Sequence, residues 1–450
     1  MQKVLLFIAL NYLFSVLSAC GDKSSIVIPP EPPAPSGTED STIVPKECSG
    51  TLPIVYINTM DLSPIVSKEE YMRAEWWLDA LGIEGFESIG SATAPLGLLI
   101  RGRGNSTWTD VEKKSYRLKF DEKHKVLGMH SSRHWVLMAQ AQYWMGQMND
   151  ALAFEIGRRM GMAWNPHMEP VEVMLNGVYA GLYFLTENVR VAKHRVNITE
   201  QRDEETDIKK VTGGWLLEID NYSEPNSISL IEGNGKPYRV TPHSPEKLSH
   251  QQLAFITDFL QKTDSAIYVT DKTSRAWEQF IDIDSLAIYY IVQEVVDNPE
   301  AFSGSCYMHK QRGEGTKLIF GPLWDCGSSF IRYSQSYIFD NFIYENVPDY
   351  CHCKWISEIA KFPRFQERVR YHWKYFYENV YPKIENYMDS FVTRIESAGY
   401  YDYRRWPQYA GDDIPGRLNV FLKPSFNKKV TWLNEQWGMS PMPHTIRTLK

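Results

Sequence analysis

An isolated carboxylate follows a short apolar segment in the second half of the chain. Residues 317–330 read KLIFGPLWDCGSSF, so Asp325 comes after a strand-like run and before the small residues Cys326 and Gly327. A carboxylate on the end of a rigid strand is a hard oxygen ligand of the kind that Mg²⁺ takes together with phosphates. The alternative is an ordinary turn after a strand. Asp325 is therefore a candidate metal ligand.

A second carboxylate, Asp297, ends a segment that we expect to be a helix over 284–296. Leu286 and Val295 are among its apolar residues, and Pro299 explains why the helix stops. The helix dipole disfavours an acidic residue at a helix C-terminus, so Asp297 needs either a compensating charge or a function. A carboxylate positioned in this way could accept the proton of a substrate hydroxyl. Asp297 is therefore a candidate catalytic residue.

A glycine-rich loop, RGRGNSTW, occupies residues 101–108, and the basic runs KK and YRLK follow it. Glycine lets a backbone approach an anion closely, and Arg and Lys supply positive charge. The spacing matches neither GxxxxGK[ST] nor GxGxxG, and a tight turn with solvated charges is the alternative. This loop is a candidate anion-binding element.

These side chains require elements to hold them, and the hydrophobic patterns predict both strands and helices. Strands are expected at 52–59, 96–101, 113–120, 135–138 and 213–220, and a hairpin at 170–187 around Asn176-Gly177. Helices are expected at 149–160, 249–262 and 284–296, and 67–82 is interpreted as a helix or mixed segment. An aromatic stripe over 365–395 predicts two core-packed helices that meet near Pro382. Strands mostly precede helices, which indicates an α+β fold.

The N-terminus has the pattern of a signal peptide. Lys3 precedes the apolar run VLLFIALNYLFSVL, which is too short to span a membrane and ends at Ser18, Ala19 and Cys20. It resembles a bacterial lipobox, so we interpret residues 1–19 as a lipoprotein signal peptide and Cys20 as the lipidated residue. An ordinary secretory signal or short anchor is the alternative. Residues 20–47 contain repeated prolines and are expected to form an extended tether. The expected location is extracytoplasmic, with a lipid anchor in a bacterial membrane, periplasmic or on the cell-surface leaflet.

The charge balance argues against a nucleic-acid partner. The chain has 48 basic and 55 acidic residues, a net charge of −7, and no long basic run. Aromatic residues make up 13% of the chain, which favours a large packed core or a stacking surface over disorder.

Five cysteines remain when Cys20 is set aside, and an odd number cannot all pair within one chain. A disulfide between Cys306 and Cys326 is one expectation for an oxidising compartment. The sequence CHC at 351–353 could supply metal ligands, although the second Cys/His pair typical of zinc sites is missing.

Taken together, several stretches resemble the CotH family, the spore-coat-protein-H-like atypical protein kinases. With its lipobox pattern, the chain resembles a bacterial lipoprotein member of that family. The stretches run in family order from about Ile54 to Phe330: IRGRGNSTW, KKSYRLKF, VLGM…WVLMA, VEVMLNGVYAGLYFLTENVRV, TGGWLLEID, YYIVQEVVDN and KLIFGPLWD. The resemblance implies a divergent protein-kinase-like fold with a strand-rich N-terminal part and a helix-rich C-terminal part. The kinase-like domain would cover 48–450, with a helical portion from about 354.

The resemblance also implies an activity and a set of residues. Members are expected to use ATP with Mg²⁺ or Mn²⁺ and to transfer the γ-phosphate to Ser or Thr of extracytoplasmic proteins. By position, Asp297 would be the catalytic-loop carboxylate and Asp325 the metal ligand. Arg103, Lys114 and Lys119 become candidates for contacts with the nucleotide phosphates.

Two further carboxylates end other predicted strands. Glu187 is a candidate for nucleotide binding, and Glu218 is a lesser candidate. An internal ion pair is the alternative interpretation for each.

One motif departs from the family pattern. The family has W-D-[FY]-D, whereas this chain has Trp324, Asp325, Cys326 and Gly327. Loss of the second carboxylate weakens a Mg²⁺ site, although water and ATP oxygens often fill such positions. Two functional classes follow: an active lipid-anchored kinase, or a degenerate kinase-like protein that binds or scaffolds other proteins at the surface. The protein substrate is not predicted by the sequence.

Overall fold

The computed structural model describes residues 47–140, 146–330, 340–346, 353–409 and 413–438. All of them belong to one compact unit, Val44–Lys450, which is described here by itself. The expected signal peptide, Cys20 and all of the tether except Glu47 lie outside the described residues. Among the helices of the described ranges, none combines the length and the apolar composition that crossing a bilayer requires.

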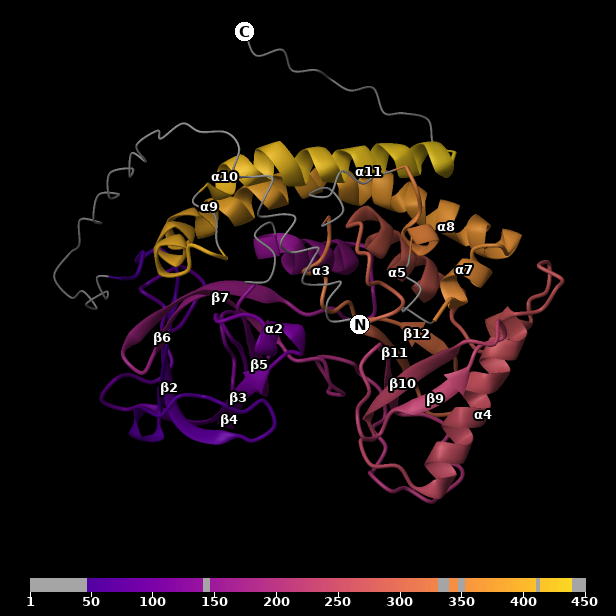
Figure 1. The fold of residues 1–450 in the computed structure, drawn as a ribbon, viewed down its shortest axis with the longest axis horizontal. Coiled ribbons are helices and arrows are strands. Elements are labelled where there is room, and N and C mark those ends of the chain that lie inside the picture. The colour runs from indigo at the N-terminus through magenta and orange to yellow at the C-terminus, as the bar shows by residue number, and fades with distance from the viewer. Residues whose placement is uncertain (1–46, 141–145, 331–339, 347–352, 410–412, 439–450) are drawn as a thin grey trace, which may run out of the picture. The chain divides into compact units, whose positions relative to one another are not determined.

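A closed barrel of seven strands forms the first part of the unit (Figure 1). Its order is β1-β2-β3-β4-β5-β7-β6, with parallel pairing only between β1 and β6, where Ile54 lies opposite Glu172. The strands are β1 (Ile54–Thr59), β2 (Met72–Asp79), β3 (Leu96–Arg103), β4 (Ser115–His124), β5 (Ser132–Met138), β6 (Met168–Leu175) and β7 (Val178–Glu187).

The barrel corrects the interpretation of 67–82 as a helix or mixed segment. Residues 72–79 form β2, which pairs with β1 and β3. Its alternate residues Ala74, Trp76 and Leu78 are at most 1% exposed and fill the barrel interior. Pairing on both sides and burial of alternate residues therefore outweigh the helix propensity of this stretch.

The hairpin and the alternating strand are confirmed. Asn176 and Gly177 both have positive φ, 53° and 74°, and join β6 to β7 as a two-residue turn. In β4 the interior residues Leu118 and Phe120 alternate with outward-facing Arg117. The outer face of this part of the barrel is therefore basic.

A second sheet of five strands follows in the order β12-β11-β8-β10-β9. Its members are β8 (Trp215–Ile219), β9 (Ile228–Ile231), β10 (Pro237–Ser244), β11 (Cys306–Lys310) and β12 (Leu318–Phe320). The predicted strands near 217 and 318 are confirmed as β8 and β12. The central strand β8 is fully buried, and the acidic residues Glu218 and Asp220 lie at its C-terminal end.

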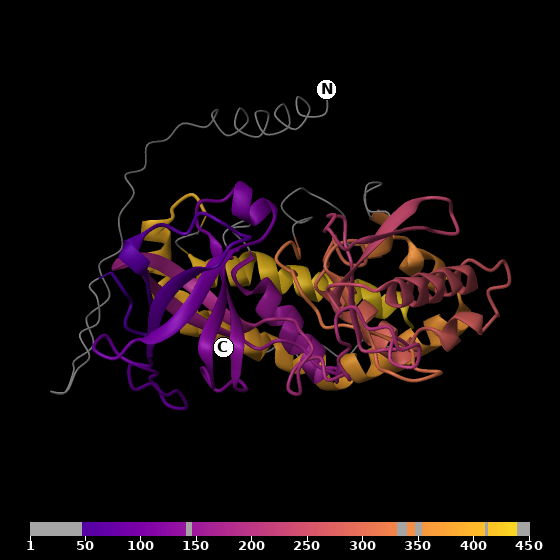
Figure 2. The same cartoon turned by 90° about the horizontal axis from the view of Figure 1, so that it is seen from below.

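Helices pack against both sheets, and Figures 1 and 2 show this arrangement from two directions. They are α2 (Ser106–Thr109), α3 (Asn149–Arg159), α4 (His250–Ile267), α5 (Ile283–Val295), α7 (Trp355–Ile359), α8 (Pro363–Tyr375), α9 (Tyr381–Arg405), α10 (Ile414–Arg417) and α11 (Lys423–Gln436). The three predicted helices are α3, α4 and α5. The aromatic stripe is confirmed as core packing: Phe365, Trp373, Phe376 and Phe391 are at most 3% exposed. The fold is a mixture of strands and helices, which confirms the α+β class.

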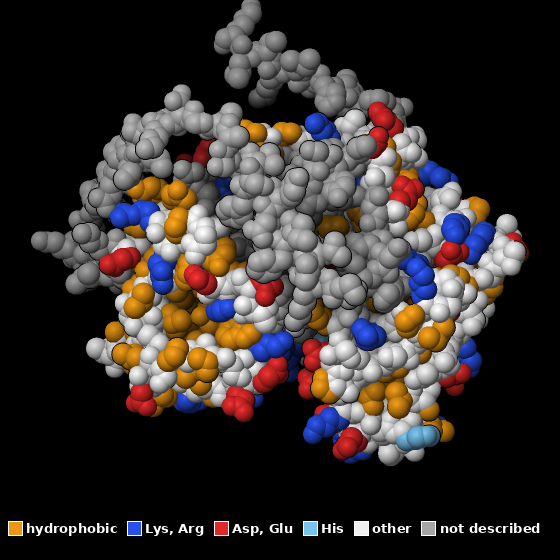
Figure 3. Space-filling model, in the orientation of Figure 1, with side chains coloured by type: hydrophobic (Ala, Val, Ile, Leu, Met, Phe, Trp, Pro, Cys, Tyr) orange, Lys and Arg blue, Asp and Glu red, His pale blue; other side chains and the backbone are white. Residues whose placement is uncertain are grey.

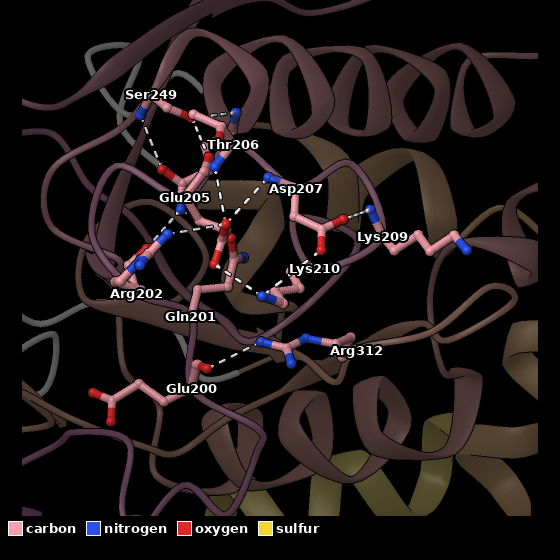
Figure 4. A network of polar contacts seen from close by, with 11 residues as sticks. Glu200, Gln201, Arg202, Glu205, Thr206, Asp207, Lys209, Lys210, Ser249 and Arg312 are labelled. Atoms are coloured by element: carbon pink, nitrogen blue, oxygen red, sulfur yellow. Dashed lines mark hydrogen bonds and ion pairs between the residues drawn. The ribbon is translucent and has the colours of Figure 1, made fainter.

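The start of α4 is fixed by a polar network (Figure 4). Ser249 accepts a hydrogen bond from the backbone N–H of Gln252 at 3.1 Å, and its hydroxyl donates to the carbonyl of Glu205. The Glu205 carboxylate in turn accepts the backbone N–H groups of Thr206 and Asp207, both at 3.1 Å. The helix cap thus holds the preceding loop in place.

Candidate active-site cleft

A cleft of about 1300 Å³ lies between the outer face of the barrel and the second sheet. The barrel side consists of β3, β4, β5 and the glycine-rich loop, and the opposite side consists of β8, β10, β11 and residues 300–305 and 324–328. Figure 3 shows a hollow between these two parts, with Lys or Arg and Asp or Glu side chains at its rim. This volume admits a ligand of nucleotide size.

The barrel wall of the cleft is basic because of strand alternation. On β3, Arg101 and Arg103 point outward while Ile100 points into the barrel, and on β4 Arg117 lies directly opposite Arg101. All three arginines line the cleft. Burial lowers the pKa of Arg117, and the neighbouring charges of Arg101 and Arg103 lower it further. Such a concentration of guanidinium groups suits a polyanionic ligand.

The glycines of the loop have structural reasons of their own. A Cβ on Gly102 would lie 2.2 Å from the ring of Trp108, and Gly104 has φ +102°. Glycine is therefore required at 102 by close packing and at 104 by backbone conformation. The loop is shaped by Trp108, and it places Arg103 and residues 104–107 on the cleft wall.

Asp325 lines the cleft within electrostatic reach of Arg103. The Asp325 side chain is exposed to the cleft, and protein atoms enclose the cleft around it. The Asp325 backbone has a positive φ of 55°. This enclosure raises the pKa of the Asp325 carboxyl, whereas the charge of Arg103 and a hydrogen bond with Ser305 lower it. Arg103 itself lies over the ring of Trp324, 5.4 Å from the ring centroid. Asp325 is thus open to a ligand.

Further carboxyl groups surround Asp325. Burial raises the pKa of Asp220 to about 7, with Glu218 as the next cause. Burial and the charge of Asp325 raise the pKa of Glu300 to about 7. The same two causes raise the pKa of Asp150 to about 6. These acids repel one another in a partly enclosed space, and a cation would relieve the repulsion.

Glu218 already has partners within the wall. Its carboxylate lies 2.5 Å from Nε2 of His243 and accepts a hydrogen bond from the hydroxyl of Tyr307. Burial lowers the pKa of His243, but the hydrogen bond and charge of Glu218 outweigh this and raise it. The internal-pair interpretation of Glu218 therefore agrees with the structure, although the residue lines the cleft.

The donor set fits a hard divalent cation. Asp325, Asp150, Asp220 and Glu300 all line the cleft and offer carboxylate oxygens to it, and the three arginines line the same cleft. Within the described residues no three His, Cys, Asp or Glu side chains form a group that could hold a metal ion by themselves. Mg²⁺ commonly uses one or two carboxylates and completes its coordination with phosphates and water, so the chemistry of these oxygens remains suitable.

Comparison with protein families places this cleft in context. The family model described as CotH kinase protein matches residues 100–436. The chain belongs to the CotH kinase protein family. A comparison with curated proteins finds no match. The CotH match begins within β3 and ends at the last residue of α11, so it includes all the cleft residues discussed above.

Within the CotH region, Asp297 lies in a buried ion-pair cluster. Asp297, Glu294 and Lys429 are each 0% exposed, and Nζ of Lys429 lies 3.3 Å from Asp297 and 3.1 Å from Glu294. Asp297 does not belong to the described residues that line the cleft. The compensating charge that a carboxylate at a helix C-terminus requires is thus Lys429 of α11. The geometry favours a structural role for Asp297, and its catalytic role stays a prediction.

The other nucleotide-binding candidates also lie elsewhere, apart from Arg103. Lys114 donates to the carbonyl of Trp108 and lies 5.3 Å from that ring's centroid. Lys119 is on the outward face of β4. Glu187 pairs with Arg195 at 3.8 Å and, on its other oxygen, with His167 at 3.2 Å. Of the described residues, the cleft lining includes neither these lysines nor Glu187, and their nucleotide contacts stay predictions.

The cysteine expectations are partly corrected. Cys306 and Cys326 are buried free thiols, so the expected disulfide between them is wrong. Cys353 is also free and buried, whereas 351–352 lie outside the described residues.

Sequence reasoning missed four residues of the cleft: Asp150, Arg117, Asp220 and Glu300. Glu300 was not predicted, because the expected end of the helix favours Asp297, three residues earlier, as the catalytic carboxylate. The run Ser303-Gly304-Ser305 after it, small and polar as ligand-approaching turns often are, was the available signal. Arg117 could have been identified from its outward position in the alternating strand β4. Asp220 follows the fully buried strand β8, which has no such alternation.

Proposed function

We propose that this chain is an atypical protein kinase that transfers the γ-phosphate of ATP to Ser or Thr of an extracytoplasmic protein, with Mg²⁺ or Mn²⁺. The observation that carries this proposal is the position of Asp325 and Glu300, which open onto the cleft opposite the arginines of the barrel. Phosphoryl transfer depends chiefly on positioning and on neutralisation of charge, and these two walls offer both.

Each wall has a distinct task in the proposed reaction. Arg103 and Arg117 would contact the phosphates, and Asp325 would hold the divalent cation. When bound, the cation would offset the negative charge of the triphosphate. The substrate hydroxyl oxygen bonds to the γ-phosphorus as the bridging bond to ADP breaks.

Glu300 is the proposed general base. Its carboxylate accepts the proton of the substrate hydroxyl, and its pKa of about 7 lies in the range where a base works best near neutral pH. Glu300 lies in the segment that follows α5. The sequence predicts a proton-accepting carboxylate in the same segment, at Asp297, and we propose Glu300 instead.

The location is proposed together with the activity. The lipobox pattern at Cys20 and the proline-rich residues after it support a lipid anchor and a tether, so that the kinase would act on proteins at a bacterial membrane surface.

Labelled ATP tests the proposal. The full chain is incubated with γ-labelled ATP, Mg²⁺ or Mn²⁺ and extracytoplasmic proteins, and transfer to protein is measured. Glu300→Gln is expected to lower transfer about 10²-fold or more without loss of nucleotide binding. Glu314→Gln, in the β11–β12 connection, is the matched control with unchanged transfer. No transfer by the wild type to itself or to any protein would contradict the proposal.

A second candidate is a nucleotide-free binding or scaffolding protein. It is supported by Gly327, which lacks the carboxylate of the family motif. Thermal-shift titration separates the two functions: ATP with Mn²⁺ raises the melting temperature of a kinase and leaves that of the scaffold unchanged.

Arg103 and Lys114 are expected to behave differently. Arg103→Ala is expected to weaken ATP binding about tenfold or more, because a guanidinium facing the cleft floor is lost. Lys114→Ala is expected to leave ATP affinity within about twofold, because its ammonium group is held by Trp108. Calorimetric titration of both variants measures the difference. Equal losses would show that Lys114 reaches the nucleotide.

Metal binding is expected to tighten as pH rises from 5.5 to 8. Asp150, Asp220 and Glu300 have pKa values raised to about 6, 7 and 7, so at low pH they are protonated and uncharged. A cation must then displace protons, which changes affinity by up to about tenfold per pH unit for each proton released. Mn²⁺ titrations at several pH values measure this slope.

The same shifts act in the opposite direction on the cation-free fold. Since the folded state holds these protons more tightly than the unfolded chain, its stability falls as pH rises from about 4 towards 7. A Mn²⁺ affinity independent of pH would show that the cation does not bind near these three carboxyls.

A further inference from the structure

The turn that carries Asp325 is fastened to the first turn of α3. The backbone N–H of Cys326 donates to Oδ1 of Asp150 at 2.7 Å. The side-chain amide of Asn149 donates to the carbonyl of Gly327 at 3.0 Å and to that of Ser329 at 2.8 Å. Two adjacent residues of one helix therefore fix the position of this turn.

Gly327 leaves a space at this turn, and Asp150 borders it. A Cβ built at Gly327 would lie 3.7 Å from Oδ2 of Asp150 and 3.7 Å from the side-chain oxygen of Gln140, with no closer contact. Both distances are ordinary van der Waals contacts, so the backbone at 327 could carry a larger side chain. The family motif has a carboxylate at the position of Gly327. In this chain the carboxylate of Asp150 lies next to that position.

Asp150 is also held in place for such a role. It is 1% exposed, and its side chain nevertheless lines the cleft, as do Gly327 and Asp325. Gln140 donates to Oδ2 at 2.6 Å, which orients the carboxylate. Asp150 and Asp325 lie within electrostatic reach of each other and of Arg103. Asp150 therefore shares the floor of the cleft with the proposed metal ligand.

We propose that Asp150 supplies the second carboxylate of the divalent-cation site, in place of the side chain missing at Gly327. The inference rests on the proposed function of the cleft, and it names one residue of that site. The carboxylate has moved from the turn after β12 to the start of α3, and the hydrogen bond from Cys326 keeps it beside Asp325. The motif of this chain is then complete in space although incomplete in sequence.

A purely structural role for Asp150 makes a different prediction. If it only anchors the N–H of Cys326, an isosteric Asp150→Asn change keeps an oxygen acceptor for that bond and has little effect on metal affinity. If its charge contacts the cation, Asp150→Asn weakens metal binding even when the fold is intact. The two roles therefore separate in a metal titration.

The test measures Mn²⁺ alone against the full chain, by calorimetry or by the spin-resonance signal of free Mn²⁺. Asp150→Asn is expected to raise the Mn²⁺ dissociation constant about 10-fold or more. Adding Gly327→Asp to Asp150→Asn is expected to restore most of that loss, because a carboxylate returns to the same place. Asp258→Asn, an exposed carboxylate on α4, is the control with unchanged affinity. Circular dichroism and melting temperature show that each variant is folded.

Each outcome decides the inference. Loss in Asp150→Asn with recovery in the double variant supports it. A Mn²⁺ affinity unchanged by Asp150→Asn, a loss that Gly327→Asp does not restore, or the absence of any Mn²⁺ binding by the wild type overturns it. The proposed kinase activity is read separately: an Asp150-dependent Mn²⁺ site without phosphate transfer would keep the inference and refute the kinase proposal. Phosphate transfer by the wild type, together with a Mn²⁺ affinity that Asp150→Asn does not change, would refute the inference and keep the kinase proposal.

Discussion

Replacing Asp325 with Asn is expected to lower phosphate transfer on the order of 10³-fold and to remove metal-dependent nucleotide binding. The side chain faces the cleft and lies outside the hydrophobic core, so the variant is expected to fold. Asn keeps the shape of the side chain but loses the charge that the cation site requires.

The same substitution is expected to leave the cation-free chain as stable as the wild type, or more stable. Enclosure by protein and the charge of Glu218 disfavour the ionised form of Asp325 and raise its pKa, and Asn removes that penalty at neutral pH. A residue that costs stability and is retained for activity is a familiar property of active sites.

Melting temperatures with and without ATP and Mn²⁺ measure both effects. The wild type is expected to be stabilised by the ligands and Asp325→Asn not at all. Asp258→Asn, on the exposed surface of α4, is expected to respond as the wild type does. An Asp325→Asn chain that still transfers phosphate would remove Asp325 from the site.

Replacing Lys429 with Met is expected to lower the free energy of unfolding by about 3–5 kcal/mol. Lys429 is 0% exposed and pairs with both Glu294 and Asp297, and its ammonium group also donates to the carbonyl of Asn341 at 2.7 Å. Without it, two carboxylates at the end of α5 are left buried side by side, with their counter-charge gone.

Chemical denaturation measures this loss, and the neighbouring residue provides the control. Lys428 is exposed on the same helix, so Lys428→Met is expected to change stability by less than about 0.5 kcal/mol. In a chain that also carries Glu294→Gln and Asp297→Asn, Lys429→Met is expected to cost much less, because the pairing is already absent. A Lys429→Met chain as stable as Lys428→Met would show that the buried cluster does not hold α11 to α5.

Asp325 and Asp297 illustrate which features of the candidate site the sequence predicts and which it does not. In the sequence, each carboxylate follows a predicted strand or helix. Asp325 lines the cleft, but the expectation that it directly ends a strand is wrong, because β12 ends at Phe320, five residues earlier. For Asp297 the deciding partner is Lys429, which lies far along the chain, and no local pattern reveals such a pairing.

The same distinction applies to the fold. Period-two alternation and the Asn176-Gly177 turn predicted the hairpin, and helical spacing predicted α3, α4 and α5. Barrel closure was not predictable, because it depends on parallel pairing of β1 with β6 across most of the barrel sequence. The expectation of a helix or mixed segment at 67–82 is wrong for the same reason, since the strand state of 72–79 depends on neighbours on both sides.

The most direct test of the account is a crystal of the full chain soaked with a non-hydrolysable ATP analogue and Mn²⁺, with the metal located by its anomalous scattering. We expect a Mn²⁺ peak at the Asp325 carboxylate, with the phosphates on the side of Arg103 and Arg117. A cleft without metal or nucleotide under these conditions, or a Mn²⁺ peak bound away from Asp325, would contradict it.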